Sequence, residues 1–227
     1  MKDTNHYEKT KEFFRISATE RKGYYDARPG GPLKHNPWQL TIRKMLIRTL
    51  GKLLNEDPGN ISSLIDVGCG RGDFTIEIAQ RFPQFSKVSG CDFSKETLSM
   101  AQQNSASLER ITFHKANLLD MPFKNNQFDV AICINVLHHI PENDLPKAIE
   151  QLSRITTKYL IVEIKNDDNF YYHYIHPKSF SGITVHLTSL GQLNPLLKSH
   201  SFRLKKQQGI FLFNWLSPLL LLTYEKC

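Results

Sequence analysis

The chain has 227 residues, 40% of them hydrophobic and 22% charged, and this composition supports an apolar core and excludes a largely disordered protein. The net charge of +7 is concentrated in residues 1–52, which hold 12 of the 29 Lys and Arg and 5 of the 22 Asp and Glu. The remaining residues are neutral overall, which excludes a uniformly basic nucleic-acid groove. The basic end indicates an anionic substrate, a membrane surface or a solvated helical face.

The cysteines and the apolar segments indicate a cytoplasmic protein. The four cysteines have neither a CxxC spacing nor a zinc-ligand spacing with histidine, so we expect no metal site and a reducing compartment. The first ten residues are polar, which predicts no secretory signal. The longest apolar stretch, residues 209–222, is broken by polar residues and is too short to span a bilayer.

In chain order, an amphipathic helix is predicted over residues 38–55, after a Pro- and Gly-rich segment at 28–32. Strands and helices then alternate. Strands are predicted at 63–67, 87–91, 111–114, 128–135, 159–164, 202–208 and 216–224. Helices are predicted at 73–82, from Ser94 onward, at 143–155 and, with a Thr188 cap, at 188–199.

This alternation predicts an α/β fold, a doubly wound and mostly parallel sheet. The last two strands have no helix between them, so one of them should run antiparallel to its neighbours. We expect residues 1–60 to form a helical N-terminal extension or cap of the same domain as residues 61–227.

A glycine-rich turn follows the first strand, in the sequence LIDVGCGRGDF of residues 64–74. Gly68 and Gly70 allow a tight turn and a close approach to a ligand. A dinucleotide fingerprint would require glycine at the position of Asp73, where a carboxylate would face a pyrophosphate. Asp66 adds a second acid, so the turn favours a ligand with an ammonium and a sulfonium over one with two phosphates.

Another acid, Asp92, ends the second predicted strand, 26 residues after Asp66. A carboxylate at that place can accept hydrogen bonds from both hydroxyls of a ribose. It can also act as the N-cap of the helix near Ser94, and the two roles are compatible.

These motifs occur in a fixed order together with residues 117–123 (NLLDMPF) and 128–140. As a set they resemble the class I S-adenosylmethionine (SAM) dependent methyltransferases, and in particular the small-molecule branch of the ubiquinone- and menaquinone-biosynthesis type. The resemblance covers about residues 62–164. It implies a Rossmann-like, seven-stranded methyltransferase fold, with SAM as cofactor and S-adenosylhomocysteine (SAH) as product.

The resemblance also implies a set of cofactor-binding residues: Asp66, Gly68, Cys69, Gly70, Asp92, Phe93, Asn117, Leu118 and Asn135. Asp66 and the glycines would line the methionine end of SAM, Asp92 the ribose, and Phe93 the adenine. Asn117 would meet the adenine amino group, with Leu118 offering its backbone N–H to a ring nitrogen. The family more often has Asp at position 117, and Asn keeps the acceptor oxygen. Asn135 would form the floor of the methyl-transfer site.

Methyl transfer is an in-line displacement that needs alignment, in some cases a base, and no metal. His138 and His139 follow the fourth strand at the mouth of the site and are candidate bases with ordinary pKa values near 6.5; alternatively they only close a turn. Glu163 ends the fifth strand and either contacts the acceptor or caps structure.

Two segments are candidate acceptor contacts: Tyr24, Tyr25, Arg28 and His35 as a lid, and Tyr171 and Tyr172 in an aromatic cluster. The aromatic residues suit a planar, lipidic or glycan acceptor, and the cations suit an anionic one. Packing of either segment on the surface without a function is the alternative.

The expected function is methyl transfer to a small-molecule, lipid or glycan-type acceptor, with peripheral membrane contact as a further option. An RNA or DNA methyltransferase is the alternative that the basic end favours. The amino-methylating enzymes of this fold usually have an [Asn/Asp]-Pro-Pro-aromatic run after the fourth strand. Here that run is Asn135-Val136-Leu137-His138, which argues against nucleic acid. A catalytically silent SAM-binding module is the second alternative.

Overall fold

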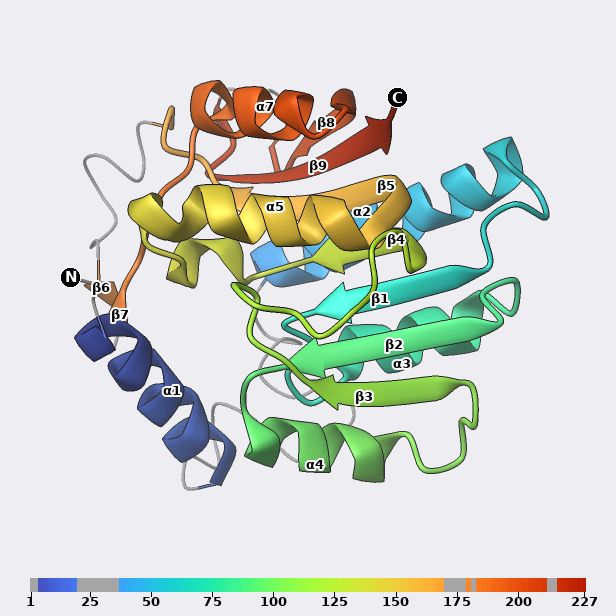
Figure 1. Cartoon of the computed structure of the whole chain (residues 1–227), viewed down its shortest axis with the longest axis horizontal. Helices are drawn as coiled ribbons and strands as arrows, with labels where there is room; N and C mark the ends of the chain where they lie inside the picture. Colours follow the sequence, from blue (N-terminus) through green and yellow to red (C-terminus); the bar gives the residue numbers. More distant parts are fainter. Residues whose placement is uncertain (1–3, 20–36, 170–178, 181–182, 212–215) are drawn as a thin grey trace.

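The computed structural model describes residues 4–19, 37–169, 179–180, 183–211 and 216–227. One seven-stranded sheet in the order β3-β2-β1-β4-β5-β9-β8 runs through the molecule, with helices on both faces (Figure 1). Its strands are β1 (Ser63–Val67), β2 (Lys87–Asp92), β3 (Ile111–Lys115), β4 (Phe128–Cys133), β5 (Thr156–Lys165), β8 (Phe202–Gly209) and β9 (Leu219–Lys226). β9 is antiparallel to both β5 and β8, and the other pairs are parallel. The predicted doubly wound sheet with an antiparallel last strand is confirmed.

The helices that cover the sheet are divided between its faces (Figure 1). α4 (Lys95–Asn104), α5 (Leu145–Ile155) and α7 (Leu190–Ser199) lie on the face nearer the viewer, and α2 (Pro37–Glu56) and α3 (Asp73–Arg81) lie behind the sheet. Two short 3-10 helices, η2 (Leu137–His139) and η3 (Glu142–Asp144), lead into α5. Within the described ranges, no helix is both long and apolar enough to cross a membrane.

Two elements were not predicted as such from the sequence. The helix α1 (Thr4–Thr19) lies beyond the carboxyl ends of the parallel strands, where it contacts α4 and β7 (Figure 1). A small hairpin of β6 (Ser179–Phe180) and β7 (Ile183–Thr184) forms the second sheet. In α1, His6, Thr10 and Phe13 are buried, so the helix is packed on one side despite its polar sequence.

The helix starts agree with the capping rules, with one correction. The hydroxyl of Ser94 accepts a hydrogen bond from the Thr97 N–H (3.2 Å) and caps α4. The cap of α7 is Ser189 and not Thr188, and Ser189 forms a capping box with Gln192. The backbone N–H of Thr188 instead donates to the Lys165 carbonyl (3.0 Å), so the chain is still extended at that residue.

The strand ends also differ from prediction for local reasons. β4 stops at Cys133, before the predicted end, because Asn135 has a positive φ of 60° that a strand does not allow. β9 begins only at Leu219, after Pro218, which has no N–H to give to a ladder. β5 begins at Thr156, directly after α5.

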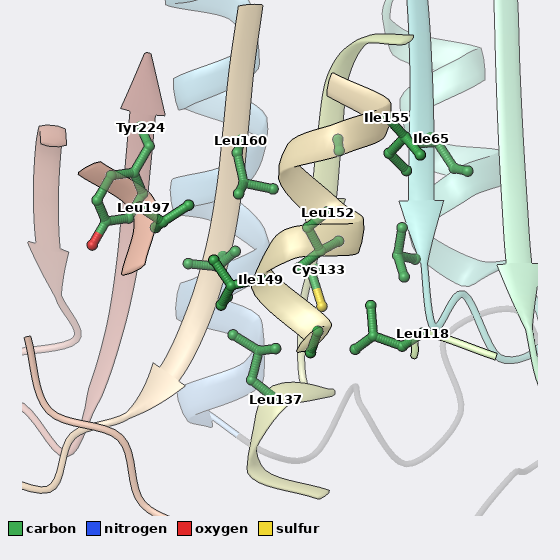
Figure 2. Packing of buried hydrophobic residues seen from close by; sticks show 14 of the residues in the cluster. Ile65, Leu118, Cys133, Leu137, Ile149, Leu152, Ile155, Leu160, Leu197 and Tyr224 are labelled. Carbon is green, nitrogen blue, oxygen red and sulfur yellow. The ribbon is translucent and has the colours of Figure 1, made fainter. Parts of the chain in front are cut away.

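Each face of the sheet has its own apolar core. Leu152, Ile149 and Ile155 of α5 point toward the strands on one face (Figure 2). On the other face, Leu46 and Leu50 of α2 pack against the sheet and are fully buried. Because both faces are covered, the central strands read as continuous apolar runs rather than as alternating ones.

Leu152 provides a test of this packing because its side chain is fully buried in the α5 core. Leu152→Ala should lower the free energy of unfolding by about 2–5 kcal/mol, through lost burial and the cavity that remains. Chemical denaturation measures the change. The matched control is Leu204→Ala on β8, where the side chain is 36% exposed and the cost should stay below about 1 kcal/mol. Equal costs at the two sites would contradict this assignment of the core.

Candidate active site

The carboxyl ends of the parallel strands meet at one edge of the sheet, and the strand order reverses beside β1, which lies between β2 and β4. Ligands of doubly wound sheets bind at such a point. The turn after β1 is fixed there by backbone bonds. Gly68 and Cys69 both donate their N–H to the Cys91 carbonyl, at 2.7 and 3.0 Å.

Positions 68 and 70 of this turn are glycine for different physical reasons. Gly68 has φ 78°, and a Cβ there would lie 2.2 Å from a Val136 methyl, so a side chain is excluded by both conformation and space. Gly70 has φ 53°, and a Cβ there would meet nothing within 4 Å. Gly70 therefore faces open space, where a ligand can approach the backbone.

Asp66 lies at the floor of this turn, 3% exposed. Its carboxylate accepts a hydrogen bond from the Thr75 hydroxyl at the start of α3 (2.7 Å). Burial, together with the charges of Asp92 and Asp73, raises the pKa of Asp66 to about 7, against the effect of the Thr75 bond. A cation bound beside Asp66 would stabilise the carboxylate and lower this pKa.

Asp92 ends β2 and is also buried. One of its oxygens accepts the Gly70 N–H and the other the Ser94 N–H, each at 2.9 Å. Burial raises the pKa of Asp92, and these backbone bonds oppose the rise. Asp92 thus links the glycine turn to the start of α4, while the N-cap itself is Ser94. The oxygen bonded to Ser94 also accepts the Thr97 hydroxyl (3.4 Å), and the oxygen bonded to Gly70 retains a second lone pair for a ligand.

The next predicted residues lie beside Asp92. The Asp92 carbonyl accepts the Ala116 N–H (3.0 Å), which brings the chain after β3 to the end of β2. Asn117 is exposed there, and its side-chain oxygen accepts the Leu119 N–H at 3.0 Å. The Leu118 side chain is buried, and Phe93 is half-buried. The side-chain oxygen predicted for a ligand is therefore already shared with a turn of its own backbone.

The loop after β4 is held against the glycine turn. Val136 fills the space over Gly68, which places Asn135 beside the end of β1. Asn135 has the left-handed φ of 60°, a conformation that asparagine adopts more readily than most residues with a side chain. The predicted residues of β1, β2 and β4 are thus brought together at one edge.

Glu163 lies near the end of β5 and is 1% exposed. Neither of its carboxylate oxygens accepts a hydrogen bond of regular geometry within the described part of the chain. Burial raises the pKa of Glu163 to about 7, and the nearby Lys165 ammonium and the Asn135 N–H act in the opposite direction. The prediction placed this group at the cleft mouth; it is instead buried beneath Asn135.

His138 and His139 form part of η2, and their predicted ordinary pKa values are wrong. The His138 side chain is buried, and burial lowers its pKa well below 6.5. Burial, the Lys165 charge and the neighbouring histidines also lower the pKa of His139. Both imidazoles are therefore uncharged at neutral pH, because the surroundings favour the neutral form.

The sequence predicts a helical N-terminal cap, but not which of its residues contact this edge. His6 of α1 donates a ring N–H to the His139 carbonyl (3.0 Å), and the Tyr7 hydroxyl donates to Asp144 of η3 (2.7 Å). The His6 ring also packs edge-on against His186, with centroids 5.0 Å apart. His186 in turn donates its backbone N–H to the His138 carbonyl (2.9 Å). No short motif in the sequence could have identified these contacts.

The acceptor candidates Tyr24, Tyr25, Arg28, His35, Tyr171 and Tyr172 lie outside the described residues. Among the residues that are described, no group of three or more His, Cys, Asp or Glu side chains could hold a metal ion.

A sequence family described as a methyltransferase domain matches residues 64–158. The "2-phytyl-1,4-naphtoquinone methyltransferase" of Nostoc sp. is 34% identical over 125 residues, 54% of this chain and 49% of the relative. The demethylmenaquinone methyltransferase of Bacillus licheniformis is 32% identical over 104 residues, 46% of this chain and 43% of the relative. The chain spans about half the length of the curated relatives it matches.

Among solved structures, the magnesium protoporphyrin IX methyltransferase from Synechocystis PCC 6803 with bound SAM superposes with a TM-score of 0.73. The two sequences are 16% identical, and the match covers 100% of both chains. This likeness shows the fold, and the sequence relatives agree with the resemblance drawn from the motifs. Residues 64–158 thus match a methyltransferase domain, the sheet has the class I SAM-dependent methyltransferase fold, and the chain is similar to 2-phytyl-1,4-naphtoquinone and demethylmenaquinone methyltransferases.

Proposed function

We propose that this protein binds SAM and transfers its methyl group to a small-molecule acceptor. The observation that carries the proposal is the pair of buried carboxylates, Asp66 and Asp92, on either side of a glycine turn with open space at Gly70. SAM has an ammonium and a sulfonium near one end and a ribose diol near the other. The two acids match these groups in chemistry and order.

The surroundings of Asp66 and Asp92 fit this cofactor. The raised pKa of Asp66 indicates a carboxylate without a cationic partner, and the ammonium of SAM would supply one. Asp92 has backbone donors on both oxygens, and the oxygen that accepts the Gly70 N–H keeps a lone pair for a ribose hydroxyl. A dinucleotide would instead bring two phosphates toward Asp66, Asp73 and Asp92, which disfavours NAD. Bound SAM would supply a methyl group already activated for displacement.

For the acceptor, we propose a quinone-type or similarly apolar small molecule. The support is the identity to naphthoquinone and demethylmenaquinone methyltransferases over about half of this chain. The absence of an [Asn/Asp]-Pro-Pro-aromatic run after β4 disfavours the amino groups of nucleic acids. Transfer of labelled methyl from SAM to a reduced naphthoquinone, with RNA as comparator, tests this assignment. Labelling of RNA alone would contradict it, and SAM binding without any methyl transfer would indicate a silent module.

Among the candidate bases, Glu163 suits a proton transfer better than the histidines. A base works best when its pKa lies near the working pH, and the pKa of Glu163 is about 7. His138 and His139 have lowered pKa values and would hold a proton poorly. We assign to Glu163 the uptake of the acceptor proton, and to His139 the positioning of α1 through its carbonyl.

Cofactor binding is tested through Asp92. Asp92→Asn keeps the shape but replaces charge-assisted hydrogen bonds by neutral ones, so SAH affinity measured by calorimetry should fall about tenfold or more. The matched control is Asp129→Asn, because Asp129 accepts the Ser62 and Ser63 N–H groups at the far end of the sheet, both at 2.9 Å. That variant should bind SAH as the wild type does. Stabilisation of the protein by NAD but not by SAH would refute the proposed function.

Burial of Glu163 should also make the free energy of unfolding depend on pH. Its pKa of about 7 lies above the unfolded value of 4.5, so the folded state binds the proton more tightly and stability falls as pH rises through this window. Glu163→Gln should therefore add about 2–3 kcal/mol to the free energy of unfolding at pH 8 and little at pH 5. The exposed Glu150→Gln on α5 serves as control. A gain that does not change with pH would contradict the burial argument, and Glu163→Gln should also lower methyl transfer more than SAH affinity.

We further propose that the N-terminal extension covers the acceptor site. The contacts of His6 and Tyr7 with η2 and η3 support this role, as do the cations of residues 1–33. Deleting residues 1–33 leaves α2 in place and should cost acceptor turnover far more than SAH affinity. Melting temperature, SAH affinity and methyl transfer are measured on one sample. A stable truncated protein with full turnover would contradict the cap.

A further inference from the structure

The end of β8 and the start of β9 lie at the same edge as the candidate active site. Leu219, the first residue of β9, pairs with Lys165 at the end of β5. The two flanks that adjoin these strand ends carry exposed apolar side chains, Phe211 at 49% and Leu216 at 42%. The Phe211 N–H donates to the Ser217 hydroxyl (3.0 Å), which ties the flanks together.

A row of cations lies on the neighbouring helix α2. Lys44, Arg48 and Lys52 are exposed and spaced four residues apart, so they form one stripe. Within the described ranges none of the three is paired with a carboxylate, whereas Arg43 on the same helix pairs with Glu77. The stripe therefore presents uncompensated positive charge to its surroundings.

The contacts between α2 and β8 place the helix that carries the stripe beside the strand that leads to Phe211. Thr49 donates to Gln208 (2.8 Å), and Glu56 pairs with Lys205 (3.3 Å). The helix thus runs antiparallel along β8, and its first half lies nearest Phe211. Lys206 of β8 lies close enough to Lys52 that, after burial, the Lys52 charge lowers the pKa of Lys206.

We propose that Phe211 and Leu216, together with Lys44, Arg48 and Lys52, form a surface that docks the protein on an anionic lipid bilayer. Exposed aromatic and aliphatic side chains enter the boundary of the bilayer, while lysine and arginine beside them meet anionic headgroups. Nucleic acid would use the cations, and a base can stack on phenylalanine, but it gives no reason for the exposed leucine side chain. Docking would turn the active-site edge toward the bilayer, from which an apolar acceptor could enter. This surface goes beyond the proposed function and is measured without methyl transfer.

The experiment is co-sedimentation of the full chain with phosphatidylcholine vesicles, with and without about a third phosphatidylglycerol. The wild type should bind the anionic vesicles, and raised salt should weaken the binding. Lys44→Glu with Arg48→Glu should lower the partition coefficient at least about tenfold, since each basic residue near such a surface contributes about fivefold. Phe211→Ser with Leu216→Ser should lower it by a similar factor and remove the binding that persists at high salt.

Two control variants separate the surface from general charge and hydrophobicity. Lys147→Glu with Lys198→Glu makes the same charge change on α5 and α7, which lie on the opposite face of the sheet (Figure 1). Leu204→Ser removes an exposed leucine near the start of β8. Both controls should bind vesicles as the wild type does, and all variants should keep wild-type SAH affinity.

The possible outcomes are distinct. If the wild type does not bind vesicles, or if the control variants lose binding to the same extent, the proposed surface is refuted even when SAH binding is intact. Salt-dependent binding of RNA without vesicle binding overturns the bilayer as partner. Vesicle binding that depends on the named residues supports the surface even when SAH does not bind, and in that case the proposed function alone fails.

Discussion

The architecture of this protein depends on two carboxylates, Asp66 and Asp92, buried close together where β1 and β2 end. The parallel register pairs Val67 with Cys91, so the two acids emerge at nearly the same level of the sheet. Burial of such groups is costly unless donors satisfy them. The glycine turn, the Thr75 hydroxyl and the start of α4 provide these donors, and the close fit of Val136 over Gly68 keeps the turn in place.

The hydrogen-bond donors to the carboxylates are unequally distributed along the sheet, and this difference marks the candidate active site. Asp129 lies at the amino end of β4, where burial alone would raise its pKa. Bonds from Ser62, Ser63 and Thr157 lower it instead, so the protein itself satisfies that charge. At the carboxyl end the pKa of Asp66 is raised to about 7. The half-buried Asp129 and the buried Asp66 thus differ in the direction of the pKa shift, and the proposed ligand-binding carboxylate is the one whose pKa is raised.

Much of this arrangement was predictable because the determinants are local. The strand β1, the Ser94 cap and the glycine turn each follow from a few adjacent residues, and alternation of strands and helices fixes the sheet. The tertiary contacts of His6 and His186 were not predictable, because they join residues more than a hundred positions apart. The pKa values of the η2 histidines depend on the same distant packing, so their neutral state could not be predicted from the sequence His138-His139 alone.

Neutral histidines and a carboxyl group poised near neutrality have a common physical origin. Around residues 135–139 and the end of β5, burial shifts the pKa values of four groups toward the uncharged form: His138, His139, Glu163 and Lys165. Burial shifts the pKa of Lys165 downward and that of Glu163 upward, while their mutual attraction opposes both shifts. A charge on an acceptor bound beside these groups would be costly unless it were paired. The burial of these side chains thus supports the proposed acceptor of low polarity, independently of what the relatives methylate.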